Sequence, residues 1–300
     1  MTSTSRTALS AEHPFPGLRP YAFEDSQFYF GREDQIYSLY RLLDRNHFIA
    51  VVGGSGSGKS SLVRAGLLPL LDAETTNAGG RSWRCVEMRP GDAPLSRLAD
   101  AVASLLPEAD DDVGRAVNAA RRERIVFALR QSSFGLAEAL DKIEGLDESS
   151  FVLVVDQFEE LFRYATSAAS QNSDLGAAAQ WREDAAHFVQ LLLEISRSQA
   201  RAVHVVITMR SDFIGDCARF HGLPEAVSAT QFLVPSLTRD QREEVIRKPI
   251  KKAGSTIEPT LVERMLNDGG DESEASGRAT LFDALVGSRG TRLGGATCPA

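Results

Sequence analysis

The chain has 300 residues, 43% of them hydrophobic, and a formal net charge of −8 at pH 7. This composition supports one large or two small folded domains, and the acidic balance gives no direct signal for nucleic-acid binding. No run approaches the roughly twenty apolar residues that span a bilayer, and the scattered cysteines form no disulfide or metal pattern, so we expect a cytoplasmic protein without a membrane segment.

The N-terminal region changes in composition at Pro14. Met1 to His13 is rich in serine and threonine, so we expect it to be disordered and to carry no targeting signal. The next segment, PFPGLRPYAFEDSQFYFGRE, has too many prolines for a regular helix but enough aromatic residues to pack on the domain. Apolar residues at helical spacing then predict an amphipathic helix from about Asp34 to Asp44.

The most informative stretch is FIAVVGGSGSGKSS, from Phe48 to Ser61. An apolar strand runs directly into a complete G-x-x-x-x-G-K-[ST] phosphate loop, a context in which a flexible Gly/Ser linker is not expected. Backbone N–H groups and a helix that starts at Lys59 form an anion cradle, Lys59 reaches the β- and γ-phosphates, and the Ser60 hydroxyl binds Mg²⁺. The predicted nucleotide-binding residues of this loop are Gly53, Gly54, Ser55, Gly56, Ser57, Gly58, Lys59, Ser60 and Ser61.

Beyond the loop, Pro69 is expected to end the first helix. Trp83 to Met88 predicts a second strand, which a turn at Arg89-Pro90-Gly91 follows. Helical patterning then continues as far as Ile143. The chain therefore alternates strands with helices.

A third predicted strand, Phe151 to Val155, ends in the sequence DQFEE. An apolar strand that ends in a carboxylate is the Walker B arrangement, in which Asp156 holds Mg²⁺, directly or through water, opposite Ser60. Glu159 or Glu160 would activate or orient the water that attacks the γ-phosphate. The alternative is an ordinary acidic surface turn, and the phosphate loop upstream favours the metal site.

The fourth predicted strand, Val203 to Thr208, leads to Arg210. Because ligands of α/β sheets bind outside the carboxyl ends of the strands, Arg210 is a candidate phosphate sensor, with a salt bridge to a neighbouring carboxylate as the alternative. His204 is interpreted as a packing histidine. The stretch before this strand, Thr166 to Gln180, is expected to be a loop or low-complexity insertion that precedes a helix.

These elements predict an α/β P-loop NTPase with a mostly parallel five-stranded sheet flanked by helices. Phe232-Leu233-Val234 supplies the fifth strand, and a capping box at Thr238 to Gln241 opens a small helical subdomain. The expected domains are a disordered N-terminus (1–13), the NTPase core (14–236), a partial helical subdomain (237–268) and a disordered or non-native tail (269–300).

An ordered series of motifs resembles the STAND class of P-loop ATPases, and most closely the novel STAND NTPases. The motifs are PFPGLRPY, FYFGRE, GGSGSGKSSLVRAGLLP, the Arg89 to Gly91 turn, VLVVDQFEELF, VVITMRSDF and QFLVPSLTRDQ. The resemblance implies that the Arg210 strand lies between the phosphate-loop and Walker B strands, and that Gly31 and Arg32 contact the nucleotide. It also implies a signalling ATPase that switches between a closed ADP state and an open ATP state that self-associates, with an unidentified signalling partner.

The chain departs from this class at its C-terminal end. Relatives continue into an apolar segment with a nucleotide-reading proline, a winged helix and sensor repeats. Gly222-Leu223-Pro224 has the letters of the proline element, but it lies before the helical region and is expected to be a loop. Gly269 to Ala300 is rich in glycine, serine and alanine, so we expect this tail not to be a working part of the ATPase fold. We interpret the gene as truncated or frame-shifted.

We therefore expect ATP and Mg²⁺ as cofactors, slow hydrolysis of ATP to ADP, and a preference for ATP because no N-K-x-D element for guanine is present. One alternative is a P-loop kinase or nucleotide transferase, which would need a second substrate pocket. Another is an interaction protein that binds nucleotide without hydrolysing it.

Overall fold

The computed structural model describes residues 9–77, 80–107, 110–143, 146, 149–164, 175–198 and 202–268. The chain divides into two compact units, each made of segments that are not consecutive in sequence. The first unit comprises Met1–Asp34, Gly54–Gly66 and Pro235–Ala300, and the second comprises Gln35–Gly53 and Leu67–Val234. The tail after Asp268 lies outside the described residues, and so the structure does not test the expectation that it is disordered or non-native.

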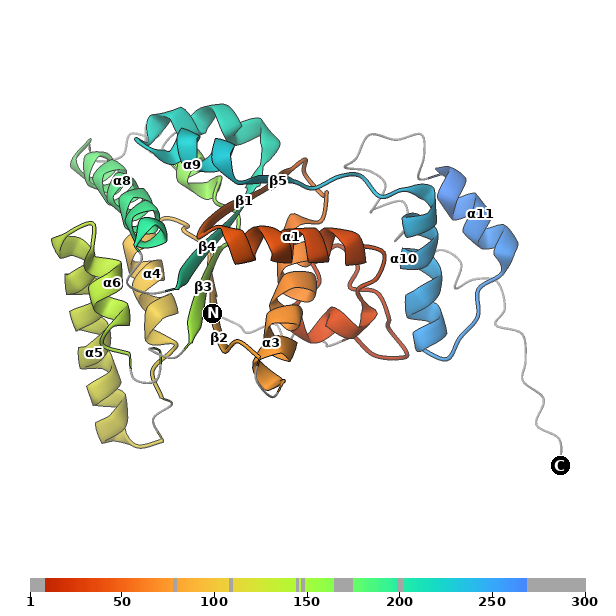
Figure 1. The fold of residues 1–300 in the computed structure, drawn as a ribbon, viewed down its shortest axis with the longest axis horizontal. Coiled ribbons are helices and arrows are strands. Elements are labelled where there is room, and N and C mark those ends of the chain that lie inside the picture. The colour runs from red at the N-terminus through yellow and green to blue at the C-terminus, as the bar shows by residue number, and fades with distance from the viewer. Residues whose placement is uncertain are drawn as a thin grey trace. The chain divides into compact units, whose positions relative to one another are not determined.

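The second unit is built on a five-stranded sheet in which every pairing is parallel (Figure 1). The strands are β1 (Phe48–Gly53), β2 (Trp83–Met88), β3 (Ser150–Val155), β4 (Val203–Arg210) and β5 (Gln231–Leu233). Their order is β2-β3-β4-β1-β5. The predicted α/β class is confirmed, and so is the position of the Arg210 strand between the phosphate-loop and Walker B strands.

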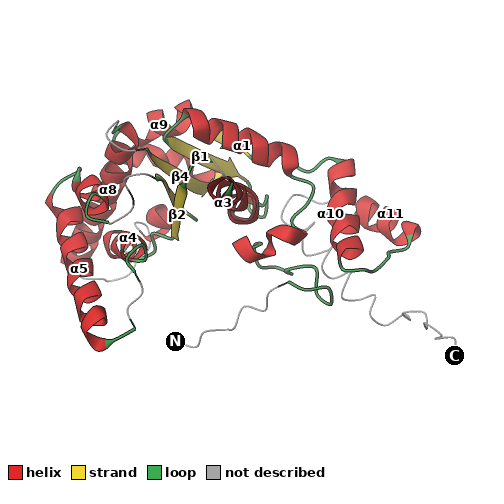
Figure 2. Cartoon of the chain, turned by 60° about the horizontal axis from the view of Figure 1, so that its bottom comes forward, coloured by secondary structure: helices red, strands yellow, loops and turns green. Residues whose placement is uncertain are grey.

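The central strands are predominantly apolar because helices cover both faces of the sheet. Every residue of β1 and β3 is buried, as is all of β4 except Arg210. In Figures 1 and 2, α4 and α8 lie on one side of the strands and α1 and α3 on the other. The helices of this unit are α1 (Glu33–Arg45), α3 (Leu68–Thr76), α4 (Pro94–Ala103), α5 (Asp112–Gln131), α6 (Gly135–Leu140), α8 (Leu175–Arg197) and α9 (Leu223–Ala229), with the 3₁₀ segment η3 (Ser211–Arg219).

Three local predictions were wrong. Pro69 lies in the first turn of α3, where its missing N–H is not needed, so it begins a helix instead of ending one. Gly222 is the left-handed N-cap of α9, with Pro224 in the first turn, so this segment is a helix start and not a loop. Within the stretch expected to be a loop, α8 already begins at Leu175, because its alanines favour a helix.

The first unit contains shorter elements and two further helices. They are η1 (Phe23–Phe28), α2 (Lys59–Ser61), the π-helix η2 (Leu62–Leu67), α10 (Arg239–Lys252) and α11 (Pro259–Asp268). The predicted capping box is confirmed, since Thr238 and Gln241 exchange hydrogen bonds at the start of α10. Ile246 of α10 packs with Val262, Met265 and Leu266 of α11 in a small separate core.

The proline-rich N-terminal segment packs on the first unit, as predicted. Tyr21 and Phe28 form a cluster with Ala65 of η2, and Leu9 belongs to the same cluster. Leu9, which lies in the stretch expected to be disordered, is therefore packed on the domain.

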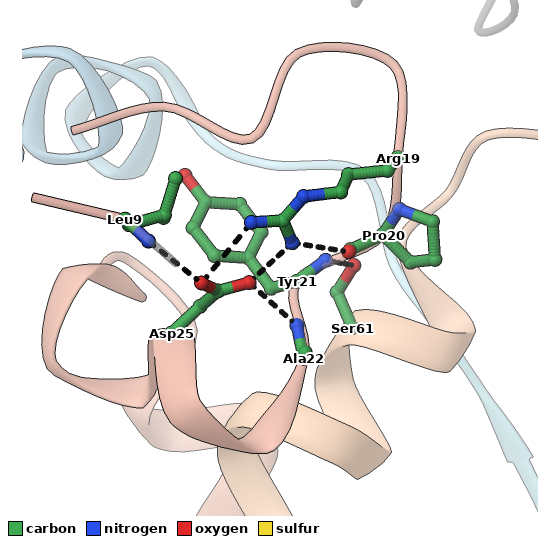
Figure 3. Close-up of polar contacts among 7 residues, drawn as sticks. All are labelled: Leu9, Arg19, Pro20, Tyr21, Ala22, Asp25 and Ser61. Atoms are coloured by element: carbon green, nitrogen blue, oxygen red, sulfur yellow. Dashed lines mark hydrogen bonds and ion pairs between the residues drawn. The ribbon is translucent and has the colours of Figure 1, made fainter. Parts of the chain in front are cut away.

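A buried ion pair fixes this segment (Figure 3). The Asp25 carboxylate accepts hydrogen bonds from Arg19 and from the backbone N–H groups of Ala22 (2.8 Å) and Leu9 (3.4 Å). Burial alone would raise the Asp25 pKa, but the Arg19 and backbone hydrogen bonds hold the pKa below its ordinary value. The carboxylate therefore stabilises the fold at neutral pH, and this contribution is lost as the pH falls through the folded-state pKa.

Among the described residues, no helix is long and apolar enough to cross a membrane.

His204 is a packing histidine, as predicted, and lies almost fully buried in β4. Its ring stacks on His47, with the ring centroids 4.7 Å apart, and its Nδ1 lies 3.1 Å from the Asn46 carbonyl oxygen. Nε2 is buried and has no hydrogen-bond partner in the part of the chain that the structure describes. Burial, with help from His47 and Arg81, lowers the His204 pKa to about 4.

This depressed pKa predicts a pH-dependent loss of stability. The unfolded chain protonates His204 near pH 6.5 and the folded chain only near pH 4, so the free energy of unfolding falls as the pH is lowered through that window. The loss from this residue is on the order of 3 kcal/mol or less. Urea unfolding across the window should show a flatter pH dependence for His204→Asn than for the parent. The exposed His221→Asn is the control, and a parental slope in His204→Asn would contradict the assignment.

Candidate functional site

The phosphate loop lies in the first unit and has the backbone of an anion cradle. Gly56 (φ 77°) and Gly58 (φ 94°) adopt the left-handed conformation, which residues with a Cβ rarely accept. Gly58 precedes the helix that starts at Lys59, as predicted. The buried Lys59 ammonium group donates to the Gly54 carbonyl oxygen at 2.7 Å, so the lysine lies across its own loop.

Arg32 lies beside this loop. Its guanidinium donates to the Ser57 carbonyl at 3.1 Å and to the Pro235 carbonyl at 2.6 Å, and the residue is only 7% exposed. Arg32 therefore ties the phosphate loop to the segment that leads into α10.

Gly31, next to it, packs against α10. A Cβ on Gly31 would lie 2.7 Å from the Gln241 carbonyl oxygen, and its φ is +78°. Glycine is required here by both the close approach and the backbone conformation. The prediction that Gly31 and Arg32 contact the nucleotide stays a prediction, because the contacts described for them are with protein.

Ser61 has a role that the motif did not indicate. Its buried hydroxyl accepts the Tyr21 N–H at 3.1 Å and so anchors the N-terminal segment to the helix behind the phosphate loop (Figure 3). Because the hydroxyl is engaged in this way, the nucleotide contact predicted for Ser61 would be made by its backbone.

The predicted metal ligand Asp156 lies in the second unit, at the end of β3, and its side chain is 1% exposed. One carboxylate oxygen, Oδ1, accepts the Thr208 hydroxyl at 2.7 Å. The other, Oδ2, accepts Nε and Nη2 of Arg89 at 3.3 and 3.2 Å. A buried carboxylate fixed at a strand end is a hard oxygen donor that suits Mg²⁺.

The residue after Asp156 makes a sharp turn. Gln157 has a φ of 56°, the one positive value among the described non-glycine residues, and its N–H donates to the Thr208 hydroxyl at 3.0 Å. Such a conformation is strained and is found where surrounding contacts enforce it, often at functional sites. Here it turns the chain out of β3 directly behind the carboxylate.

Glu159 and Glu160 have different surroundings within the same unit. Glu159 is buried and lies 3.4 Å from the Arg210 N–H, which donates to its Oε2. Glu160 is partly exposed, and its Oε2 accepts the Gly91 N–H at 2.9 Å. Glu160 therefore holds the turn that follows β2.

Arg210 forms the salt bridge that was the alternative interpretation, with Asp212 two residues further on. This hydrogen bond and ion pair lower the Asp212 pKa. Within the described chain, Nε of Arg210 is buried and carries no hydrogen bond. The side chain therefore has a salt bridge and an unused donor at the same time.

Each unit thus gathers part of the predicted site. Gly31, Arg32 and the loop from Gly54 to Ser61 belong to the first unit, and Gly53, Asp156, Glu159, Glu160 and Arg210 belong to the second.

Sequence reasoning missed Thr208 and Arg89, both partners of Asp156. Thr208 is a polar residue inside an apolar strand, and Arg89 directly follows a predicted strand that neighbours β3. These two sequence positions were the signals that could have identified Thr208 and Arg89 as partners of Asp156.

Comparison with known proteins now decides the family. The family model described as Novel STAND NTPase 1 matches residues 14–279. The chain belongs to this STAND NTPase family. No curated protein matches the NTPase significantly.

Solved structures support the fold of this STAND NTPase. The ORC1 protein of Aeropyrum pernix, solved in complex with DNA, matches with a TM-score of 0.53 and 15% identity over 88% of this chain and 62% of that one. The Walker-type ATPase PABY2304 of Pyrococcus abyssi matches with a TM-score of 0.51 and 14% identity over 91% of this chain and 72% of its own. The Aeropyrum pernix ORC2 protein, in ADPNP–ADP complexes, matches with a TM-score of 0.50 and 12% identity, over 86% and 61%.

At these identities the likeness shows the fold alone. The NTPase spans about three fifths of the length of the two ORC proteins.

The Ser61 contact yields a stability prediction. Ser61→Ala leaves the Tyr21 N–H without its acceptor, at a cost of about 1–3 kcal/mol in the free energy of unfolding. Chemical denaturation without nucleotide measures this loss. Ser55→Ala is the matched control, because Ser55 is exposed in the same loop and should change stability little. Equal stabilities of the two variants would contradict the anchoring role of Ser61.

Proposed function

We propose that this STAND NTPase is an Mg²⁺-dependent ATPase module that serves as a nucleotide-controlled conformational switch. The observation that carries the proposal is the Asp156 carboxylate, buried at the end of β3 and oriented by Thr208, in a chain whose lysine-bearing loop has two left-handed glycines. A buried carboxylate and an anion cradle are the two groups that a magnesium nucleotide needs.

In this proposal the loop from Gly53 to Ser61 holds the phosphates. Its backbone N–H groups and the Lys59 ammonium neutralise the anion, and the Ser60 hydroxyl and Asp156 hold Mg²⁺. The metal would supply charge neutralisation on the phosphate oxygens. The bound nucleotides are ATP and ADP, with adenine preferred over guanine.

Glu159 is the proposed water-activating group. It is a buried carboxylate three residues beyond Asp156, and a carboxylate beside the attacking water can accept its proton as a general base. Glu160 is assigned a structural role, because the Gly91 N–H donates to its Oε2 at 2.9 Å, a shorter hydrogen bond than the 3.4 Å one from the Arg210 N–H to Glu159 Oε2.

Arg210 is the proposed phosphate sensor. Its buried Nε without a hydrogen bond supports this role, because an anionic ligand would satisfy that donor. In this proposal the phosphate competes with Asp212 for the guanidinium.

The switch role is supported by Arg32. The guanidinium bonds both to the phosphate loop and to Pro235, which precedes α10, so a movement of the loop on nucleotide binding reaches the helical region through this side chain. Self-association in the ATP state and a signalling partner belong to the same proposal.

Phosphate release under multiple-turnover conditions tests the proposal. Slow, Mg²⁺-dependent release from ATP is expected. Transfer of the phosphoryl group to an acceptor other than water would favour a kinase, and nucleotide binding without any release would favour a non-hydrolysing binding protein.

The different surroundings of the two glutamates predict different kinetics. Glu159→Gln should keep Mg-ATP binding while turnover falls by about a hundredfold or more, the usual range for a lost general base. Glu160→Gln is the matched control, because its amide oxygen can still accept the Gly91 N–H and turnover should stay close to the parental rate. Steady-state phosphate release and equilibrium binding of ATP measure both. Slower turnover in Glu160→Gln than in Glu159→Gln would reverse the assignment.

A further inference from the structure

Arg89 is the side chain that the proposed function leaves without a role. It follows β2, next to β3 in the sheet, and its guanidinium holds Oδ2 of the proposed metal ligand Asp156 through Nε and Nη2. A positive charge therefore lies on the carboxylate that the proposal assigns to Mg²⁺.

Thr208 and Arg89, which both bond to Asp156, differ in freedom. Thr208 is buried within β4, and its hydroxyl accepts the Gln157 N–H, so its single proton is directed to Asp156 Oδ1. The Arg89 side chain, in contrast, is 43% exposed. A half-exposed guanidinium can exchange its carboxylate partner for water at little cost, whereas the buried hydroxyl has no such exchange.

The backbone on both sides of Arg89 is fixed. The Asp156 N–H donates to the Met88 carbonyl at 2.8 Å, and the Gly91 N–H donates to Glu160 at 2.9 Å. Movement at this position is therefore limited to the Arg89 side chain, and the strand does not need to shift.

A divalent cation and a guanidinium compete for one carboxylate oxygen. Mg²⁺ requires a close oxygen donor, and a second positive charge beside it is unfavourable. Without metal, the same arginine offsets the negative charge of this buried carboxylate.

We propose that Arg89 is a positioning residue that serves as the metal-free counter-ion of Asp156, and that Mg²⁺ arriving with the nucleotide displaces it from Oδ2. This inference rests on the proposed function. While the site lacks metal, Arg89 keeps the carboxylate in place. Because Arg89 competes with the metal, it also raises the Mg²⁺ concentration that half-saturates the site in the presence of nucleotide. The displaced guanidinium turns to solvent.

The test is a Mg²⁺ titration of the full chain with a fluorescent N-methylanthraniloyl ADP, whose use avoids hydrolysis. In Arg89→Gln the half-saturating Mg²⁺ concentration should be about three- to tenfold lower than in the parent, because the competing charge is gone. Arg89→Lys keeps the charge and should stay closer to the parent. Arg97→Gln is the matched control, since Arg97 forms an exposed ion pair with Asp92, 3.6 Å away, and should leave the titration unchanged.

An unchanged or higher Mg²⁺ requirement in Arg89→Gln would overturn the inference, while ADP binding by the parent would leave the proposed function intact. No binding of the ADP analogue by the parent at any Mg²⁺ concentration would overturn both. If Arg89→Gln does not fold, the parent itself gives the answer through ¹⁵N spectra of the arginine Nε–H groups. The Arg89 signal, assigned with Arg89→Lys, should change when Mg-ADP replaces metal-free ADP, and an unchanged signal would overturn the inference.

Discussion

The second unit depends on one buried charge, the Asp156 carboxylate at the end of β3. Removing a carboxylate from water is costly unless each oxygen finds a donor. Here the Thr208 hydroxyl donates to Oδ1, and Nε and Nη2 of Arg89 donate to Oδ2. These partners come from β4 and from the end of β2, the two strands that flank β3. The parallel order of the sheet thus brings together the groups that orient the carboxylate.

The first unit holds the loop that we propose binds the nucleotide phosphates. Left-handed glycines shape the loop, Lys59 supplies the charge, and Arg32 and Ser61 connect the loop and its helix to other segments. Ser61 receives the N-terminal segment, whose own position is fixed by the Arg19–Asp25 ion pair. Residues far apart in the sequence therefore support the few that would meet a nucleotide.

The sequence was sufficient for the strands because each is rich in apolar residues, and it was sufficient to place Asp156 at the end of β3 and Lys59 at a helix start after the glycine loop. The roles of Lys59 and Asp156 stay predictions. It was insufficient where the outcome depends on tertiary partners. Nothing local distinguishes Glu159 from Glu160, and the difference comes from Gly91, far away in sequence. Pro69 and Gly222 were misread for a related reason, since the same residues begin helices as readily as they break them.

The central claim is that the loop binds a magnesium nucleotide through Lys59, and calorimetric titration of ATP in the presence of Mg²⁺ tests it most directly. The parent should bind ATP, and Lys59→Ala should bind about ten- to a hundredfold more weakly, because a charged hydrogen bond to phosphate is lost. Lys142→Ala, at an exposed lysine, is the control and should bind as the parent does. Absence of binding by the parent, or parental affinity in Lys59→Ala, would contradict the account.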